Sequence, residues 1–468
     1  HDGNRHAVFF THPREIITYH FERNPADPRV QHALTLEVDA FGNVLKAAAI
    51  GYGRRRNATD PAFTDADSLK QRLIHITATE NTFTNPVDDA DGNYRTPLPV
   101  EARTYELTGF ELEDEAVRFS FEEWTRDDFA FPGSAAEIPY EQIADNVSKE
   151  KRLIEHVHTL YRPDDLGAAQ NDPLALLPLG TVEPLALPGE SYQLALTPGL
   201  LNQVYVRNGQ RLLPADPADV LEGGGAHRGG YVDLDGDANW WIPSGRVFFS
   251  PGSADTATQE LAHARQHFFL PHRTRDPFHT DAVGTESFFS YDTYDLLMLE
   301  TRDMIGNRVT VGERKFNGDI DPDKPGNDYR VLQPRRMMDP NRNRTAVAFD
   351  ILGLVVGTAV MGKPEENFGD SLDGFVADLS EADILDHLVD PLANPHAILG
   401  RATTRLVYDL FAYQRSKDQP DPQPAVVYSL ARETHDADLE TGQQTKNQHG
   451  FSYSDGFGRE IQKKFQAE

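Results

Sequence analysis

Hydrophobic and polar residues alternate over many short stretches of this chain, and the stretches come in pairs. Residues 34–38 and 44–47 alternate on the two sides of a short polar break, and residues 297–301 and 308–311 repeat the arrangement farther along. Alternation with a period of two is typical of half-buried β-strands. The pattern therefore predicts repeated units of strand, turn and strand.

The polar breaks share one spacing, in which an aspartate is followed by two variable residues and a glycine, usually with a polar residue after it. Aspartate can accept hydrogen bonds from the amides just ahead, and glycine can adopt the left-handed conformation that closes a type I turn with a bulge. We therefore interpret the breaks as structural hairpin turns. They lie at Asp39, Gly42 and Asn43, at Asp303, Gly306 and Asn307, at Asp350 and Gly353, at Asp455 and Gly458, and without the glycine at Asp339 to Asn343.

A lone hairpin is not stable in water, so these units must pair side by side into a larger sheet. We predict a mainly β fold, an antiparallel sheet strip with a few short helical insertions. Because sheets twist with one hand, a long strip of this kind curls and can form the wall of a shell.

Two stretches carry helical patterns. Residues 256–269 place their apolar positions on one stripe, as a surface helix does. Residues 379–399 read as a helical insertion, and Ser380 and Asp383 have the spacing of a capping box at its start.

Other stretches are harder to assign. We expect residues 140–159 to form a helix that leads into a strand, and residues 192–205 have helical spacing despite an internal Pro-Gly pair. The acidic and aromatic residues 113–132 are interpreted as surface decoration. Residues 425–432 and 450–465 are predicted as two closing strands, the last without a visible partner.

We divide the chain into three segments. The first, residues 1–160, is a β-segment, and the second, residues 161–280, contains the helix at 256–269. The third, residues 281–468, contains most of the hairpin turns and the insertion at 379–399.

Composition narrows the function classes. Hydrophobic residues make up 39% of the chain, which is enough for a folded core, and no apolar run is long enough to span a membrane. A formal charge of −29 repels nucleic acids and anionic membranes. The absence of cysteine excludes disulfides and thiolate metal sites. The chain begins with His1 and has no signal-like segment, so we expect it to be a piece of a longer protein.

Asp233, Asp235 and Asp237 form the strongest candidate for a cation site. Alternating carboxylates are the ligands that calcium prefers, and Gly236 permits a sharp bend. No glutamate stands at the twelfth position of an EF-hand loop, however, so an ordinary aspartate-rich turn before the Trp240-Trp241 pair is the competing interpretation.

His263 and His267 lie one helical turn apart, which is the spacing of zinc ligands. Ala264 stands where the general base of a zinc protease would be. Glu260, His272 and His279 could complete a site, but we favour a surface helix with satisfied histidines.

Ser244 lacks the nucleophile elbow of serine hydrolases, and no phosphate-binding loop occurs. We therefore predict no enzymatic activity and no required cofactor.

Several longer phrases, in this order, resemble a known family. They are similar to the middle-to-C-terminal region of the B component of insecticidal toxin complexes, the SpvB/TcdB-like family, with its YD or Rhs repeats. The likeness runs from about residue 12 to residue 363, with a looser tail. The phrases are HFERNP (20–25), GYGRR (51–55), YRTPLP (94–99), ARTYELTG (102–109), GYVDLDGD (230–237), WWIPSGR (240–246) and QHFFLP (266–271).

The resemblance implies an Rhs-like β-shell segment at 1–160, a TcdB-like segment at 161–280 and a YD-repeat β-shell segment at 281–468. It implies that the chain is a non-enzymatic part of a hollow shell that holds a C-terminal toxic effector. The partners would be a C-component-like Rhs half with its effector, and an A-component channel reached through a propeller outside this chain. The complex would be secreted by a bacterium-like source, with no nucleic acid bound and no membrane insertion by this segment.

Two family features do not carry over, because the propeller lies upstream of the matching phrases and the self-cleaving aspartyl site of the C component is not found. Two alternatives remain open. One is a YD-repeat surface adhesin that binds a glycan with calcium at residues 233–241. The other is a zinc hydrolase centred on His263 and His267.

Overall fold

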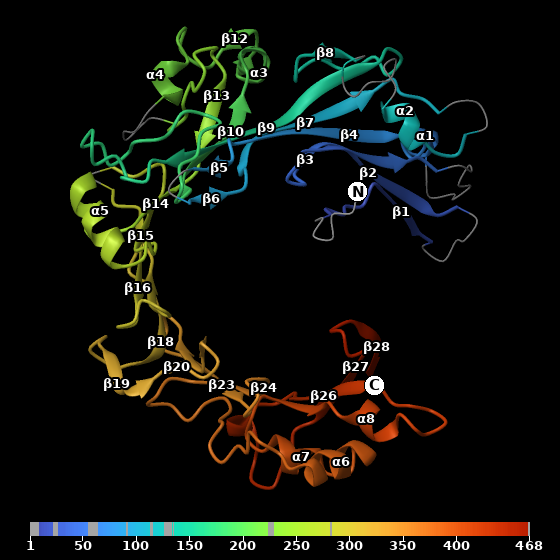
Figure 1. The fold of residues 1–468 in the computed structure, drawn as a ribbon, viewed down its shortest axis with the longest axis vertical. Coiled ribbons are helices and arrows are strands. Elements are labelled where there is room, and N and C mark those ends of the chain that lie inside the picture. The colour runs from blue at the N-terminus through green and yellow to red at the C-terminus, as the bar shows by residue number, and fades with distance from the viewer. Residues whose placement is uncertain are drawn as a thin grey trace. The chain divides into compact units, whose positions relative to one another are not determined.

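The computed structural model describes residues 9–21, 27–54, 64–89, 92–112, 116–125, 133, 135–222, 229–280 and 283–466. The chain forms two compact units, His1–Thr285 and Glu286–Glu468, whose elements are labelled in Figure 1. Both units consist mainly of antiparallel sheet, and the predicted fold class is confirmed. No helix in the described ranges has the length and apolar character of a membrane span.

The first unit is built on a nine-stranded sheet in the order β1-β2-β3-β4-β7-β9-β10-β13, with β8 beside β9. Its neighbours run antiparallel, except that β8 pairs with β9 in parallel. The strands are β1 (Glu15–His20), β2 (Arg29–Val38), β3 (Val44–Tyr52), β4 (His75–Phe83), β7 (Pro99–Thr108), β8 (Ala136–Ile138), β9 (Glu150–Arg162), β10 (Leu187–Leu196) and β13 (Trp240–Pro243).

Shorter elements surround this sheet. Hairpins form from β5 with β6 and from β11 with β12, and β14 pairs with β15 in antiparallel across the segment that contains α5. The elements are α1 (Asp65–Lys70), β5 (Val87–Asp88), β6 (Tyr94–Arg95), α2 (Phe121–Thr125), α3 (Pro198–Val204), β11 (Val206–Arg207), β12 (Gln210–Arg211), α4 (Ala218–Leu221), β14 (Arg246–Phe248), α5 (Ala257–Gln266) and β15 (Arg273–Arg275).

The main core of the first unit lies on one face of the large sheet. Alternate residues of β2, β3, β4 and β7 meet there, and Phe119 and Trp124 of the segment around α2 pack onto them. The backbone amide of Phe119 donates a hydrogen bond to the hydroxyl of Tyr52 at 3.0 Å. The alternation of apolar and polar residues in the sequence therefore gives the sheet one apolar face, as expected for half-buried strands.

The second unit contains a sheet in the order β16-β17-β18-β22-β23-β24-β25-β26-β27-β28, with β19 also on β18. Its strands are β16 (Glu286–Tyr291), β17 (Met298–Arg302), β18 (Arg308–Arg314), β19 (Ile320–Pro325), β20 (Asn327–Asp328), β21 (Gln333–Pro334), β22 (Arg336–Met338), β23 (Arg344–Phe349), β24 (Val355–Met361), β25 (Thr404–Asp409), β26 (Ala425–Arg432), β27 (Asn447–Ser454) and β28 (Glu460–Phe465). Its helices are α6 (Glu381–Val389), α7 (Pro395–Leu399), α8 (Ala412–Ser416) and the 3-10 turn η1 (Asp436–Asp438).

Both predicted helical patterns are confirmed. Helix α5 occupies most of residues 256–269, and Thr256 caps its first turn. The insertion at 379–399 contains α6 and α7, and the capping box between Ser380 and Asp383 is present. The core beneath β25 and β26 includes apolar residues of both helices.

Three assignments were only partly correct. Residues 140–159 contain no helix, because β9 covers Glu150–Arg162 and pairs with β7 and β10 on its two sides. Residues 192–205 are divided between β10 and α3, since Thr197 caps a helix that has Pro198 in its first turn. Residues 450–465 are two strands, β27 and β28, that pair with each other.

The interpretation of residues 113–132 as surface decoration was also wrong where the structure describes them. Phe119 and Trp124 are almost completely buried, because α2 covers the apolar face of the sheet. Residues 113–115 and 126–132 lie outside the described residues. The division into three segments remains a prediction.

Candidate functional site

The hairpin corners recur with one hydrogen-bond pattern. At Asp39, one carboxylate oxygen accepts hydrogen bonds from the amides of Phe41 and Asn43, both at 2.8 Å. The amide of Asp39 donates to the carbonyl of Asn43 at 3.0 Å, and Gly42 has a φ of 86°. Burial acts to raise the pKa of Asp39, but the hydrogen bonds from Asn43 and Phe41 outweigh it and hold this pKa below its ordinary value.

The later corners repeat this arrangement. Asp303 accepts from the amide of Asn307 at 2.8 Å, and Asp350 accepts from the amide of Leu354 at the same distance. Gly306 and Gly353 have φ values of 89° and 83°. The Asp455 corner also fits, because its carboxylate accepts from the amides of Phe457 and Arg459, at 2.8 and 3.4 Å, and Gly458 has a φ of 81°.

The corner at Asp339 keeps the pattern without glycine. The Asp339 carboxylate accepts from the amide of Asn343 at 2.8 Å and from its side-chain nitrogen at 2.9 Å. Arg342 occupies the glycine position with a φ of 71°. The sequence analysis missed another corner of this kind at Asp89, where Gly92 has a φ of 80°, although its spacing is the same.

The three aspartates of the predicted calcium loop lie in an exposed turn after α4. The Asp233 carboxylate accepts from the amides of Asp237 and Ala238, at 3.1 and 3.3 Å, and Asp237 accepts from Asn239. The groups of metal-ligand type found among the described residues do not include Asp233, Asp235 or Asp237. The carboxylates of Asp233 and Asp237 therefore already have backbone partners.

The two tryptophans that follow this loop are buried in β13. Trp240 is 5% exposed and Trp241 is 1% exposed. Neither ring is presented as a platform for a sugar, and the aromatic pair belongs to the packing of the first unit.

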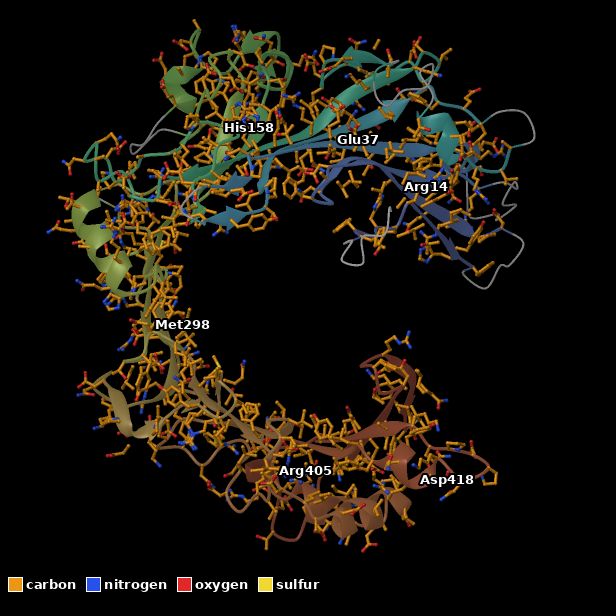
Figure 2. The ribbon with its side chains drawn as sticks, in the orientation of Figure 1. Arg14, Glu37, His158, Met298, Arg405 and Asp418 are labelled. Carbon is orange, nitrogen blue, oxygen red and sulfur yellow. The ribbon has the colours of Figure 1, made fainter. Side chains whose placement is uncertain are left out.

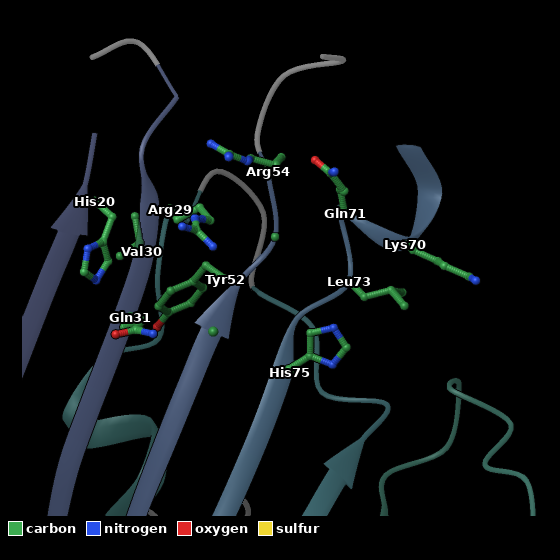
Figure 3. Close-up of a pocket in the computed structure, with 12 residues that line it drawn as sticks. His20, Arg29, Val30, Gln31, Tyr52, Arg54, Lys70, Gln71, Leu73 and His75 are labelled. Carbon is green, nitrogen blue, oxygen red and sulfur yellow. The ribbon is translucent and has the colours of Figure 1, made fainter. Parts of the chain in front are cut away.

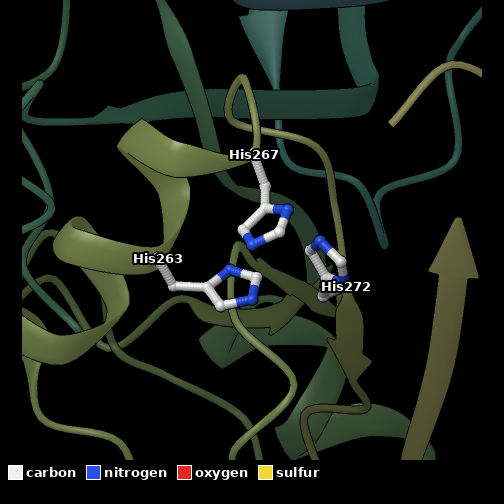
Figure 4. Close-up of side chains that lie close together, drawn as sticks. All are labelled: His263, His267 and His272. Atoms are coloured by element: carbon white, nitrogen blue, oxygen red, sulfur yellow. The ribbon is translucent and has the colours of Figure 1, made fainter. Parts of the chain in front are cut away.

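The structure brings a third histidine to the pair on α5. The rings of His263, His267 and His272 lie side by side, with centroids 4.1 to 5.6 Å apart (Figure 4). The ring Nδ1 of His263 is 2.9 Å from the carbonyl of Phe249, which can only accept, so Nδ1 is the donor of this hydrogen bond. These three residues are the α5 histidine cluster, whose ligand atoms lie within 4.8 Å of one another.

The other residues considered for a zinc site lie elsewhere. Glu260 is buried in a two-pronged ion pair with Arg162, at 2.9 and 3.0 Å. His279 accepts a hydrogen bond from the amide of Thr285 through its Nδ1. Glu260 therefore does not supply a general base to the α5 histidine cluster.

A second group of metal-ligand type was missed from the sequence. Glu101 on β7 and His156 and His158 on β9 bring one oxygen and two ring nitrogens together. The position of His158 is labelled in Figure 2. We call these residues the carboxylate–histidine cluster. Its signal was the His-x-His spacing, which puts both rings on one face of a strand but on different faces of a helix.

A basic cavity lies at one end of the large sheet. It has a volume of about 680 Å³, and the ends of β1, β2, β3 and β4 contribute to it (Figure 3). Arg54 in this lining already donates to the carbonyl of Asp27 at 2.6 Å and lies 3.9 Å from its carboxylate. The ionisable side chains in its lining are His20, Arg29, Arg54, Lys70 and His75.

Comparison with known proteins gives one family match. Residues 1–94 match the family described as the insecticide toxin TcdB middle/C-terminal region. No match was found among curated proteins.

Solved toxin structures align with nearly the whole chain. A crystal structure of TcdB2-TccC3 covers 96% of this chain at 19% identity, with a TM-score of 0.46. The same complex without its hypervariable C-terminal region covers 96% of this chain at 18% identity, with a TM-score of 0.47. The Photorhabdus luminescens Tc holotoxin pore covers 96% at 17% identity, with a TM-score of 0.46. The chain spans 18%, 21% and 20% of these three chains. The match over residues 1–94 makes this a chain similar to the B component of insecticidal toxin complexes.

Proposed function

We propose that this chain is a non-enzymatic part of a toxin-complex shell that encloses a C-terminal toxic effector. The observation that carries the proposal is the order of the sheets. From β1 to β4, and again from β22 to β28, each strand pairs with the next strand of the sheet in chain order. A wall built in this way grows by adding hairpins, and its extent is set by their number.

The corners support a structural role for the repeated aspartates and glycines. Each aspartate uses its carboxylate on backbone amides of its own turn, so these side chains hold the chain direction and are not available as acids or bases. On this proposal the partners are a C-component-like Rhs half with its effector, and an A-component channel. The complex acts outside the cell that secretes it.

The proposal is tested by protection of the effector. The C-component-like half is expressed with its effector, either alone or together with the B component that carries this chain, and both samples are treated with protease. We expect co-elution of the two halves, and an effector that is cut at least tenfold more slowly in the joint sample. Equal rates of cutting would refute the enclosure.

A small-angle scattering envelope of the chain is an independent test. A curved wall or a hollow outline is the expected result, whereas a compact solid globule would contradict the proposal. The calcium-dependent glycan adhesin predicts instead that a glycan array loses its signal when a chelator is added. We expect no calcium-dependent signal, because Trp240 and Trp241 are buried.

A further inference from the structure

The carboxylate–histidine cluster lies between two neighbouring strands of the first unit. Glu101 on β7 stands opposite His158 on β9, and Arg103 stands opposite His156. Residues two apart on a strand point to the same face, so these four side chains share one face of the sheet. Sheet hydrogen bonds on both strands hold their positions.

Three ligand-type atoms meet at one point. The Nε2 of His156 is 2.6 Å from Oε1 of Glu101, and the Nε2 of His158 is 3.0 Å from the same oxygen. The two Nε2 atoms are 3.0 Å apart. The three separations are short enough for a single point off their plane to lie about 2.1 Å from each atom, which is the distance at which zinc binds imidazole and carboxylate.

Hydrogen bonds crowd this arrangement. The carboxylate has only lone pairs, and each neutral imidazole has one proton for two nitrogens. If both Nε2 atoms carry protons, both donate to one Glu101 oxygen while the two nitrogens lie 3.0 Å apart. If either lacks its proton, a lone pair faces that oxygen. A cation between the three atoms relieves this crowding.

Trp241 closes the inner side of the cluster. Its ring stacks on His158 with centroids 4.6 Å apart, and it meets His156 edge-on at 4.7 Å. The Nδ1 of His158 is buried and has no hydrogen-bond partner, so this ring is tied to the cluster through Nε2 alone. The two rings are therefore fixed before any ion arrives.

The outer side is open to solvent. Glu101 and Arg103 line a cavity of about 590 Å³ that also contains the carboxylates of Glu37, Asp39 and Glu80 and one lysine, Lys46. This acidic lining attracts cations. It gives an ion a route from solvent to the Glu101 oxygen.

In this structure Arg103 is the counter-ion of the Glu101 carboxylate. Its guanidinium is 2.7 Å from Oε1 of Glu101, and its Nε is 3.3 Å from Nε2 of His156. The side chain is 43% exposed, so it can turn into solvent when another cation binds. Arg103 and a metal ion therefore compete for the same oxygen.

We propose that Glu101, His156 and His158 bind one divalent transition-metal ion of the zinc class, which joins strands β7 and β9. Two imidazole nitrogens and one carboxylate oxygen suit zinc and cobalt better than calcium or magnesium. The site clamps the sheet of the first unit, and its fourth position is open to water. This site is separate from the α5 histidine cluster, which consists of His263, His267 and His272.

The test is titration of the metal-free full chain with Co²⁺, followed by its visible absorption, and with Zn²⁺ in competition with a chromophoric chelator. We expect one ion per chain at this site and a melting temperature that rises with Zn²⁺ concentration. Glu101→Gln and His156→Ala should each weaken binding at least tenfold. His263→Ala, in the α5 histidine cluster, is the matched control and should leave this binding unchanged.

Arg103→Gln gives the sharpest outcome, because it removes the competing cation and should tighten Zn²⁺ binding severalfold. A purely structural Arg103–Glu101 ion pair predicts no such gain. The proposal is overturned if the wild-type chain binds no Zn²⁺, if His263→Ala abolishes binding, or if Arg103→Gln weakens it. Because Arg103 is partly exposed, this variant is informative even if the buried histidine variants do not fold.

Discussion

The two units are both antiparallel sheets, but they bury different groups. In the first unit, strands of nine or ten residues such as β2, β3 and β4 present an apolar face to Phe119 and Trp124. In the second unit, the strands from β17 to β24 have two to seven residues, and Glu313 and Arg314 are buried among them. The hydrophobic clusters of the described residues draw on none of residues 286–361.

This difference shows that one strand pattern can be stabilised in two ways. The first sheet gains stability from apolar area that leaves water. Residues 286–361 rely more on corners and on charged groups with partners, such as Arg336 and Arg344, which both pair with Glu313. The experiments below test this contrast.

The largest loss is expected from breaking the buried ion pair of the first unit. Arg162 and Glu260 are 0% and 2% exposed, and Glu260 also accepts from the amide of Phe249 at 2.8 Å. Glu260→Ala leaves the guanidinium buried without its carboxylate, which costs about 3–5 kcal/mol. Arg330→Ala, in an exposed pair of the second unit, should cost about 1 kcal/mol or less. Denaturant unfolding checks both, and similar losses would contradict the contrast.

A core truncation should follow closely. Leu34 is 2% exposed in the apolar face of the first sheet, so Leu34→Ala should cost about 2–5 kcal/mol. Leu352 is 67% exposed at a corner of the second unit, and Leu352→Ala should change the free energy of unfolding by less than about 0.5 kcal/mol. If the two variants melt at the same temperature, the apolar face is not what holds the first sheet.

The corners should give a smaller and more uniform effect. An added Cβ at Gly306 meets nothing within 4 Å, so Gly306→Ala or Gly306→Val tests only the left-handed backbone, at a cost of about 1–2 kcal/mol. Gly42→Val should cost at least as much, because Phe10 must also move. Gly284→Ala, which has open space and no positive φ, is the control and should cause no loss. Unchanged melting of Gly306→Val would mean that the corner is unimportant.

The smallest effect is expected from pH. Burial, His449 and Arg405 lower the pKa of His387, and burial and His396 lower the pKa of His449. Below the ordinary pKa of about 6.5 the unfolded chain binds these protons first, so the stability of the second unit falls as pH falls. Melting between pH 7.5 and 5 measures this, and His387→Gln should weaken the dependence. In the first unit Glu15, 2.9 Å from His32, offsets part of the effect of burial.

Local chemistry was enough to predict part of this structure. The turns at Asp39 and Asp303 depend on residues at most four positions apart, and the capping box joins Ser380 to a residue three positions later. A short stretch of sequence therefore contains every residue that these features need. The pair of Arg162 and Glu260 joins residues 98 positions apart. No local pattern indicates such a partner.

The carboxylate–histidine cluster was missed from the sequence for a more specific reason. Residues 150–158 alternate, but residues 140–159 were predicted as a helix that leads into a strand, and the start of the strand was not located. A helix places His156 and His158 on different faces. Correct assignment of β9 would have put both rings on one face, yet Glu101 enters only through the register of β7 against β9. The burial of Trp124 was also missed, because the acidic residues around it in the sequence suggested an exposed segment.

The corner at Asp339 has a practical consequence for counting repeats. Its backbone geometry is kept by the aspartate and the asparagine four positions later, while an arginine occupies the fourth position. A motif that requires the aspartate with either glycine at the fourth position or asparagine at the fifth will therefore detect units that a glycine-based search passes over. Applied to longer chains of this kind, such a motif would measure the length of the repeat array from sequence.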